Sequence, residues 1–406
     1  MHKFTQSYKI KDNMDSINNW RYSKLNSGIV KLLLLSFGVR MSNQLLESVS
    51  NEKKISKNYY YYDSPNASEL SKKYRLPSEI LLPDEVESSF YINRYSPLEI
   101  VEAKKDHLQL LYNDNIISDL QFNYGPQFFD IKLSDGTFGK QHASMYGRNI
   151  LGLFLSGYCH YPAKSLGCKF CSIRSTRSDL GKQNIFSLSP SKLKELIKLM
   201  PDSDIKRIKY VMYTAGTYPD VDNGIQVQAL TISTVAKMLP PRVKHHLTTM
   251  PPKDLNKTRI LRDIGLQTLA YDIEVYDKNL FKFFCPGKQK LYGQENMFKA
   301  IEEGVKVFGY TNLKVGFVGG LEPISSMKLG MQRFASVGAG ISINVFHPDS
   351  KTELENYSRP TPEYLIDMVR IQRDLYKQYN LIPVFPNGGR RSSLDSEVYR
   401  GFFNEI

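Results

Sequence analysis

Residues 150–171 read ILGLFLSGYCHYPAKSLGCKFC, an apolar run that passes directly into a loop rich in cysteine. The run at 150–155 is short and continuously apolar, which is typical of a strand covered on both faces in a parallel sheet. Three cysteines stand in the loop that follows, Cys159, Cys168 and Cys171, with the spacing C-x8-C-x2-C. Because the loops after parallel strands carry the chemistry of α/β folds, this stretch predicts both a fold class and a site.

Apolar strand patterns and amphipathic helical patterns alternate along the rest of the chain. The predicted strands are 150–155, 208–213, 243–249, 268–275, 313–318 and 341–346, with a further strand at 382–385. The predicted helices are 190–200, 225–239, 255–264, 296–307, 325–337 and 362–379. Such alternation indicates a parallel sheet with right-handed crossovers, either an open doubly wound sheet or a full or partial (β/α) TIM-type barrel. The regular repeat without a Gly-x-Gly-x-x-Gly turn favours the barrel.

The part before residue 149 has a different pattern. We expect residues 1–148 to form an N-terminal α+β extension with a small β element, and residues 149–406 to form the barrel domain. Asp135-Gly136 lies between the apolar stretches 128–133 and 137–138, which predicts a hairpin. No motif in the extension indicates its role.

The composition excludes several classes of protein. Of 406 residues, 41% are hydrophobic and 12% aromatic, enough for a sizeable core, which argues against a wholly disordered chain. Four cysteines are too few for a disulfide scaffold, and their clustering is typical of metal binding in a reducing compartment. The N-terminus lacks the pattern of a secretory signal, and no apolar run approaches the ~20 residues of a membrane span. We therefore expect a cytoplasmic protein with no membrane partner.

The net charge is positive, with 54 Lys and Arg against 41 Asp and Glu, a balance of +13. This surplus permits binding to nucleic acid, but no nucleic-acid motif accompanies it, so a solvated basic surface is the favoured interpretation.

The cysteines alone leave two metals open. Three thiolates on one loop can hold three irons of a [4Fe–4S] cluster and leave the fourth iron open to another ligand. A structural zinc ion would take a fourth ligand from His or Cys, and His160 and Cys285 are the candidates.

Several motifs together resemble the radical S-adenosylmethionine (SAM) superfamily, over about 149–391. The first is Gly167-Cys168-Lys169-Phe170-Cys171 after the first strand. The others follow later strands in the order of that family: 213–217 (YTAGT), 272–276 (DIEVY), 316–322 (GFVGGLE) and 344–348 (NVFHP). The last resembles members similar to biotin synthase. The commonest family spacing is C-x3-C-x2-C, so the longer first gap indicates an atypical branch.

This resemblance implies two cofactors, a [4Fe–4S] cluster and SAM. Cys159, Cys168 and Cys171 would bind the cluster. The residues that would contact SAM are Thr214, Ala215, Gly216 and Thr217 at its amine, Asp272 and Glu274 at its polar groups, and Gly316 and Val318 near its adenine. Thr217 stands where the family often has an acidic residue, so backbone carbonyls would bind the amine. Lys288 or Lys290 would replace the basic residue that pairs with the SAM carboxylate.

The resemblance also implies an activity. Such enzymes cleave SAM reductively to a 5′-deoxyadenosyl radical, which abstracts a hydrogen atom from a substrate, here expected to be a small molecule. An electron donor such as flavodoxin or ferredoxin is the expected partner. Whether the enzyme is a lyase, a transferase or an oxidoreductase stays open. The alternatives are modification of tRNA or a peptide, and a non-catalytic zinc-stabilised binding module.

Four further residues are candidates for the reaction. Cys285, after the fourth strand, would quench a radical, hold a substrate or ligate a second metal, unless it is a buried inert thiol. A single extra cysteine cannot hold an auxiliary cluster, which disfavours sulfur insertion. His347 at the end of the sixth strand is a second catalytic candidate. Arg390 and Arg391 would bind a substrate anion or form a surface pair. In the fourth strand, Asp272 and Glu274 share one face if the alternation continues to residue 275.

Overall fold

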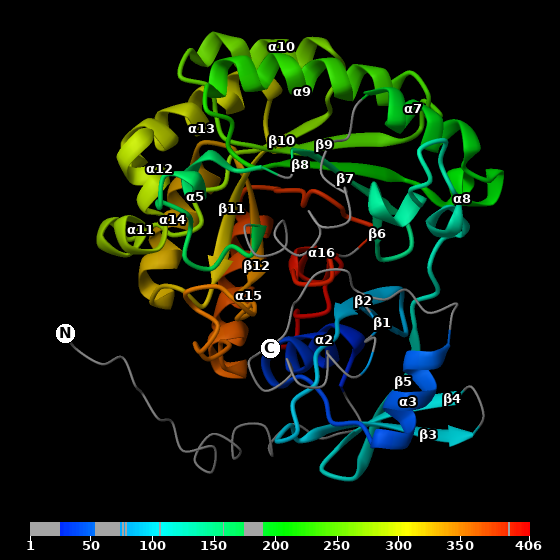
Figure 1. Cartoon of the computed structure of the whole chain (residues 1–406). Helices are drawn as coiled ribbons and strands as arrows, with labels where there is room; N and C mark the ends of the chain where they lie inside the picture. Colours follow the sequence, from blue (N-terminus) through cyan, green and yellow to red (C-terminus); the bar gives the residue numbers. More distant parts are fainter. Residues whose placement is uncertain are drawn as a thin grey trace.

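The computed structural model describes residues 25–52, 74, 77, 79–104, 107–156, 158–173, 190–388 and 390–406 (Figure 1). Two sheets organise these residues. A five-stranded antiparallel sheet has the order β2-β1-β5-β4-β3, and a seven-stranded sheet has the order β12-β11-β10-β9-β8-β7-β6. In the described part of the chain, no helix has the length and apolar character that crossing a membrane would require.

The seven-stranded sheet curls into a half-barrel. Its strands are β6 (Ala143–Tyr146), β7 (Ile150–Ser156), β8 (Tyr210–Ala215), β9 (Lys244–Thr248), β10 (Thr268–Ala270), β11 (Leu313–Gly319) and β12 (Gly340–Val345). β6 runs antiparallel to β7, and β7 to β12 run parallel, each beside the next strand in the chain. An open doubly wound sheet reverses its strand order part-way, so that alternative is wrong and the partial (β/α) barrel is confirmed.

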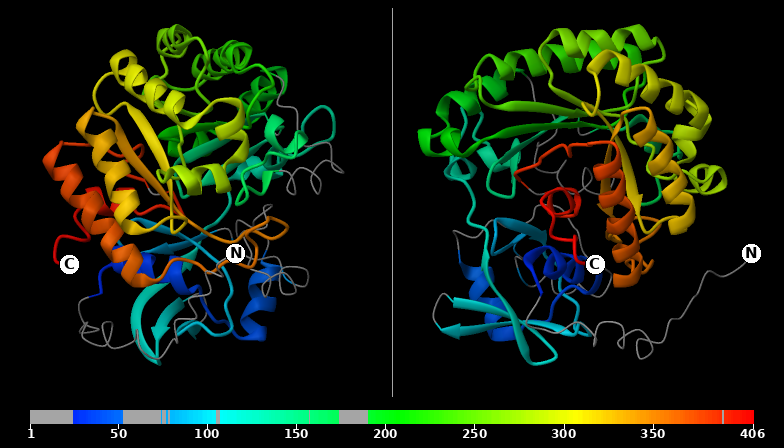
Figure 2. Two further views of the ribbon diagram at one scale, coloured as in Figure 1. Left: turned by 90° about the vertical axis from the view of Figure 1, so that its left-hand side faces the viewer. Right: turned by 180° about the vertical axis from the view of Figure 1, so that it is seen from behind.

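Helices cover the outer side of this sheet, as Figure 2 shows. They are α7 (Pro190–Leu199), α8 (Asp202–Arg207), α9 (Val221–Ala236), α10 (Thr258–Asp263), α13 (Gln294–Phe308), α14 (Ile324–Ser336) and α15 (Pro362–Gln378). Three short helices, α5 (His160–Ala163), α11 (Lys278–Phe284) and α12 (Pro286–Leu291), lie in the loops after β7 and β10. The apolar faces of the longer helices and the strands form one buried core with the N-terminal elements. Phe281 and Phe284 of α11 belong to a second, smaller core cluster.

The predicted strand at 382–385 is wrong, because β12 is the last strand of the sheet. Backbone amides at the edge of β12 that has no neighbouring strand find other acceptors. The Ile343 amide donates to the Asp395 carboxylate at 3.0 Å, and the Val345 amide donates to the Ser392 carbonyl at 2.7 Å. Ile382 is exposed, but residues 383–385 are buried by a different contact, since Val384 and Phe385 pack against β7 and β8. The apolar run therefore marks burial without strand pairing.

The concave side of the half-barrel is occupied by the C-terminal segment. α16 (Asp395–Tyr399) lies inside the curve of the sheet in Figures 1 and 2. Four of its five residues, Asp395 to Val398, are buried, although three of those four are polar or charged. Their polar groups must therefore find partners inside the protein.

The fourth barrel strand is shorter than predicted, because β10 ends at Ala270. Glu274 follows with a φ of 65°, in the left-handed region, and forms an isolated bridge with Phe317 of β11. The alternation argument for Asp272 and Glu274 is therefore wrong, since regular strand geometry does not extend to either residue.

The N-terminal part contains α2 (Ser27–Phe37), α3 (Asn43–Asn51), β1 (Glu79–Leu82), β2 (Val86–Ser89), β3 (Leu98–Lys104), β4 (His107–Tyr112) and β5 (Asn115–Phe122). The predicted hairpin at Asp135-Gly136 is reduced to a turn with one isolated bridge between Lys132 and Phe138. The stretch before it forms a short 3-10 helix, Gln127–Asp130. The domain division at residue 148 stays a prediction.

Candidate active site

The cysteine loop leaves the carboxyl end of β7 and folds back over the neighbouring strand. The His160 amide donates to the Thr217 carbonyl at 2.8 Å, and the Lys169 amide donates to the Phe284 carbonyl at 2.9 Å. A Cβ atom at Gly216 would stand 2.2 Å from the Tyr158 carbonyl oxygen. Glycine at 216 therefore lets the loop lie directly against the end of β8.

The three cysteines of this loop are described, and none is in a disulfide. Cys159 and Cys168 are half-buried, while Cys171 is exposed as a residue. The protein packed around its thiol, and then the neighbouring thiols of Cys168 and Cys159, raise the pKa of Cys171. No group of three His, Cys, Asp or Glu side chains among the described residues converges closely enough to hold a single metal ion.

Cys285 lies beside the loop, at the junction of α11 and α12. It is completely buried and shares a hydrogen bond with Cys168, which is the first cause of the raised pKa of Cys168; burial is the second. The structure thus places a fourth thiol against the cysteine loop. Its catalytic role stays a prediction.

Lys288 projects from α12 into the space after β10. Its Nζ donates to Glu274 Oε1 at 2.7 Å and to the Asp272 carbonyl at 2.5 Å. Burial opposes the charge on Lys288, but Glu274 and the nearby thiols outweigh it and raise the pKa of the ammonium. Lys290, its alternative, is exposed. Lys288 is therefore the lysine that lies at the site.

Asp272 lies over Gly316 of β11. A Cβ atom at Gly316 would stand 2.0 Å from Asp272 Oδ1, so only glycine leaves room for this carboxylate. Burial, and then the charge of Glu274, raise the pKa of Asp272 to about 6. Asp272 and Glu274 are close together, and the positive charge of Lys288 partly offsets their mutual repulsion.

A cavity of about 320 Å³ opens at this end of the half-barrel. Its wall includes six of the candidate site residues, Asp272, Glu274, Val318, His347, Arg390 and Arg391. Phe170 of the cysteine loop also lines the cavity. The wall does not include the other predicted residues, which are Thr214, Ala215, Gly216, Thr217, Gly316, Lys288, Cys285 and the three loop cysteines. The structure therefore brings the predicted residues to one end of the barrel, in two neighbouring groups.

His347 is oriented by a chain of hydrogen bonds that reaches the cysteine loop. Its Nδ1 pairs with Asp349 Oδ1 at 2.7 Å, and Asp349 Oδ2 accepts a hydrogen bond from Ser172 Oγ at 2.6 Å. Ser172 is the residue after Cys171. This arrangement couples the β12 loop to the cysteine loop, and it leaves the catalytic role of His347 a prediction.

Three arginines line the cavity wall. Arg390 and Arg391 have side-chain exposures of 15% and 8%, so the interpretation as a surface pair is wrong. Arg359 also lines the cavity, and sequence reasoning missed it. Ser89, Phe90, Tyr91 and Tyr146, from the part before residue 149, were missed as well, because nothing in their local sequence relates them to the barrel.

The chain has a relative of known function by sequence. No protein-family model matches the sequence. Over 266 residues the chain is 26% identical to bacteriochlorophyllide c C-7(1)-hydroxylase of Chlorobaculum limnaeum. That match covers 61% of this chain and 65% of the relative, so it spans just under two thirds of the relative's length.

Solved structures with a similar arrangement include methylornithine synthase, with a TM-score of 0.42, 17% identity and coverage of 55% of this chain and 62% of that one. Coproporphyrinogen III oxidase from Escherichia coli, described as a radical SAM enzyme, has a TM-score of 0.39, 14% identity and coverage of 57% and 53%.

The chain is similar to radical SAM enzymes.

This is the superfamily that the cysteine motif predicts, and its cofactors can be tested against the residues present. Each cysteine ligand of a [4Fe–4S] cluster binds a different iron, so the thiols need not converge on one point as they do around a single zinc ion. The chain offers three thiols on one loop that influence one another, with a buried lysine and two carboxylates beside them. This donor set fits a radical SAM cluster with one open iron.

Proposed function

We propose that this chain is a radical SAM enzyme that holds a [4Fe–4S] cluster on Cys159, Cys168 and Cys171 and acts on a small molecule. The observation that carries the proposal is the position of the cysteine loop. The loop follows the first barrel strand and lies against the second, at the end of the barrel where Glu274 and Lys288 pair. In a barrel, this end is where chemistry takes place.

The bound cofactors would supply one chemical capability, the reductive cleavage of SAM to a 5′-deoxyadenosyl radical that abstracts hydrogen. The protein positions and shields the reacting groups. Glu274 and Asp272 would accept hydrogen bonds from polar groups of SAM, and Lys288 holds Glu274 in place. Val318 would offer the adenine an apolar surface in the cavity wall. Gly216 lets the cysteine loop lie against the end of β8.

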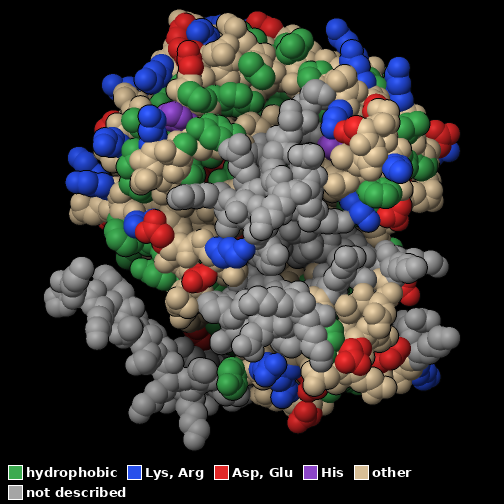
Figure 3. All heavy atoms as spheres, in the orientation of Figure 1, with side chains coloured by type: hydrophobic (Ala, Val, Ile, Leu, Met, Phe, Trp, Pro, Cys, Tyr) green, Lys and Arg blue, Asp and Glu red, His purple; other side chains and the backbone are tan. Residues whose placement is uncertain are grey.

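The cavity supports a small substrate over tRNA or a peptide. One side of it is formed by Phe90 and Tyr91 of the N-terminal part and by Tyr146 of β6 in the half-barrel sheet. On the face in Figure 3, Lys and Arg side chains of the described surface gather at the left edge and are interspersed with Asp and Glu at the right. The relative's name describes a hydroxylase of bacteriochlorophyllide c, which supports an oxidoreductase of a small molecule.

The proposal includes a partner and a compartment. An electron donor such as flavodoxin or ferredoxin would reduce the cluster. The three cysteine thiols require a reducing environment, which supports the cytoplasm.

The test is anaerobic purification with iron, zinc and sulfide analysis, followed by electron paramagnetic resonance of the reduced protein with and without SAM. We expect about four irons and four sulfides per chain and a spectrum that SAM changes. Cys168→Ala should lose the cluster, and the matched variant Cys285→Ala should keep it. One zinc per chain, no sulfide after reconstitution and no response to SAM would refute the proposal.

A further inference from the structure

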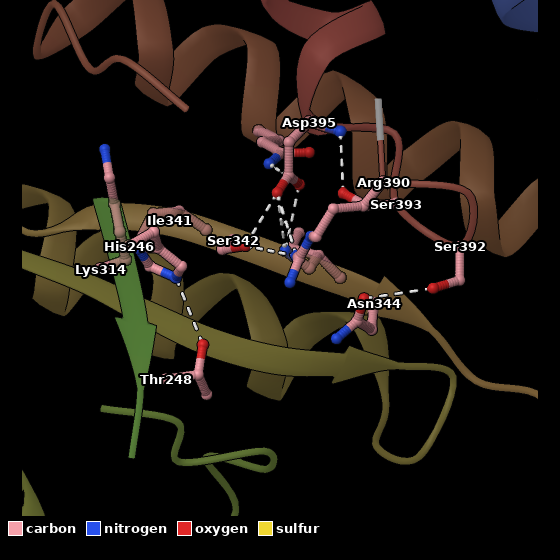
Figure 4. A network of polar contacts seen from close by, with 12 residues as sticks. His246, Thr248, Lys314, Ile341, Ser342, Asn344, Arg390, Ser392, Ser393 and Asp395 are labelled. Carbon is pink, nitrogen blue, oxygen red and sulfur yellow. Dashed lines mark hydrogen bonds and ion pairs between the residues drawn. The ribbon is translucent and has the colours of Figure 1, made fainter. Parts of the chain in front are cut away.

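Charged groups inside the half-barrel are matched to partners within the protein. Figure 4 shows Arg390 close to Ser342 and Asp395: its Nη2 donates to Ser342 Oγ at 2.5 Å and lies 3.5 Å from Asp395 Oδ2. Lys31 and Glu397 form a second buried pair. Lysines without such partners lie on the outside of the protein, beside the cysteine loop.

Two stretches of the chain, 158–173 and 278–291, contain six lysines and no acidic residue. The first stretch is the cysteine loop with α5, and the second comprises α11 and α12. Lys169 and the buried Lys288 are engaged in ion pairs. The other four lysines are exposed and have no ion-pair partner among the described residues; they are Lys164, Lys278, Lys282 and Lys290.

The acidic residues nearby do not cancel these charges. Glu353 pairs with Lys169, and Asp277 accepts hydrogen bonds from two backbone amides as the N-cap of α11. Glu295, after the second stretch, is exposed in the first turn of α13. The four exposed lysines therefore outnumber the two acidic residues, Asp277 and Glu295, that flank their helices without pairing with a described lysine.

The helices that carry these lysines are packed onto the cysteine loop. The Lys169 amide donates to the Phe284 carbonyl at 2.9 Å, and a Cβ atom at Gly287 would stand 2.5 Å from the Leu166 carbonyl oxygen. In Figure 3, Lys and Arg side chains gather at the left edge, which is the side where Figure 1 places α11 and α12. The basic surface thus lies directly beside the loop with the three cysteines.

Two large apolar side chains are exposed on the same helices. Phe283 of α11 and Leu291 of α12 have exposures of 47% and 40%. The Lys169 ammonium lies 4.9 Å from the centre of the Phe283 ring, so this ring adjoins the cysteine loop as well. Apolar side chains with charged residues around them are typical of a surface that a partner protein covers.

The chemistry of this surface fits an acidic protein better than a nucleic acid. Neither stretch contains an arginine, the residue that binds phosphates in a bidentate manner. A lysine acts as a point charge that attracts an acidic partner over a distance and raises its rate of association. Such attraction suits a small, transient interface, and electron-transfer complexes have interfaces of this kind.

We propose that α11, α12 and the cysteine loop form a docking surface for an acidic protein that carries single electrons. This lysine surface consists of Lys164, Lys278, Lys282, Phe283, Lys290 and Leu291. The inference rests on the proposed function, because a cluster on the cysteine loop gives the protein a reason to receive electrons. The carrier is oxidised by one electron and the cluster is reduced by one, and no bond is formed or broken. Since electron transfer weakens steeply with distance, the carrier must bind beside the loop, and the lysine surface lies there.

The test is stopped-flow reduction of the reconstituted full-length protein by a reduced bacterial flavodoxin, followed by the absorbance of the cluster. We expect the second-order rate constant to fall by about tenfold or more from low to high ionic strength, because salt screens exposed charges. Photoreduced deazariboflavin, a small uncharged reductant that needs no docking, should reduce the protein at a rate that does not depend on salt. A flavodoxin rate that does not depend on salt would overturn the proposal.

Variants locate the surface. Flavodoxin should reduce the double variant Lys282→Glu, Lys290→Glu about tenfold or more slowly than the unmodified protein, because two charges that attract it are reversed. The iron and sulfide content and the rate with deazariboflavin should stay unchanged. The matched control is Lys194→Glu, Lys198→Glu on α7, whose lysines are also exposed and which lies on the opposite side in Figure 1.

Equal flavodoxin rates for the two double variants would overturn the proposal. If circular dichroism shows that the charge-reversed variant does not fold, Lys282→Gln, Lys290→Gln tests the same surface with a smaller expected loss. Calorimetric titration at low ionic strength then compares oxidised flavodoxin with tRNA. Tighter binding of tRNA that is lost in the same variant would assign the surface to a nucleic acid and would also overturn the proposal.

The two proposals fail separately. Flavodoxin binding that depends on Lys282 and Lys290 in a protein without iron, sulfide or a response to SAM would refute the enzyme proposal and support the docking surface. An intact cluster that responds to SAM, and that flavodoxin reduces equally fast in the variant and the unmodified protein, would refute the docking surface and support the enzyme proposal.

Discussion

Lys31 of α2 and Glu397 of α16 form an ion pair from which solvent is completely excluded. Both side chains have an exposure of 0%, and Nζ lies 3.0 Å from Oε1. The pair joins two segments that are 366 residues apart in the chain. Replacing Lys31 by methionine keeps an unbranched side chain of similar length but leaves the Glu397 carboxylate buried without its counter-charge.

The expected cost is about 3–5 kcal/mol of unfolding free energy, the usual result of removing one partner of a buried pair. Burial already raises the pKa of Glu397, and Lys31 opposes that rise. Without Lys31 the pKa rises further, so Glu397 takes up a proton in the folded state. The penalty of Lys31→Met is therefore smallest at acidic pH and grows as the pH rises, because the folded protein then binds more protons than the unfolded chain.

The assay is equilibrium urea unfolding followed by circular dichroism at several pH values. The double variant Lys31→Met, Glu397→Met should recover most of the loss, because a buried pair replaced by apolar groups of similar volume is often close to neutral. Lys306→Met is the matched control: its pair with Glu303 is exposed at both ends, and its loss should cost less than about 1 kcal/mol. Additive effects of the two single variants, or a cost of Lys31→Met equal to that of the control, would refute the reasoning.

Two further predictions concern the contact between the N-terminal part and the barrel, and the cysteine loop. Burial raises the pKa of Glu79 from 4.5 to about 7, so between these pH values the folded state keeps a proton that the unfolded chain loses. The unfolding free energy should therefore fall by about 3 kcal/mol as the pH rises through this range. Glu79→Gln should abolish that fall, which urea unfolding at acidic and neutral pH measures. A persistent slope in the variant would contradict this assignment. Gly216→Ala should displace the cysteine loop and severely lower the iron and sulfide content of the folded protein. Gly167→Ala is the control: its Cβ would meet Pro162 at 3.1 Å, so the iron and sulfide content should fall less. Full cluster loading of Gly216→Ala would show that the loop does not need this contact.

The sequence predicts well the strands that their own apolar residues mark. The strands β7, β8, β11 and β12 begin and end within two residues of the predicted ranges, because each is a mainly apolar run between polar turns. The resemblance placed Lys288, Glu274 and Asp272 at one end of the barrel, and they lie there. That agreement follows from the strand order, since loops after parallel strands meet at one rim.

The failures have a common physical cause. Residues 382–385 are apolar, but whether they pair as a strand depends on what satisfies the edge of β12, and Asp395 does so from a later part of the chain. Arg390 and Arg391 follow a turn and carry charge, so local rules place them on the surface. Their burial depends on partners that no local pattern reveals, Ser342 and Asp395 for the first and Glu79 for the second.

These distant partners also give the N-terminal part a structural role at the cavity. Lys31 donates both to Glu397 and to the Arg390 carbonyl, and Glu79 of β1 faces Arg391. Two of the three cavity arginines are therefore positioned by groups that precede the barrel in the sequence. A barrel without those groups would bury Glu397 with no counter-charge and would leave Arg391 without Glu79. The N-terminal part thus contributes to the charge balance of the cavity as well as to its wall, and a change in either segment alters the other.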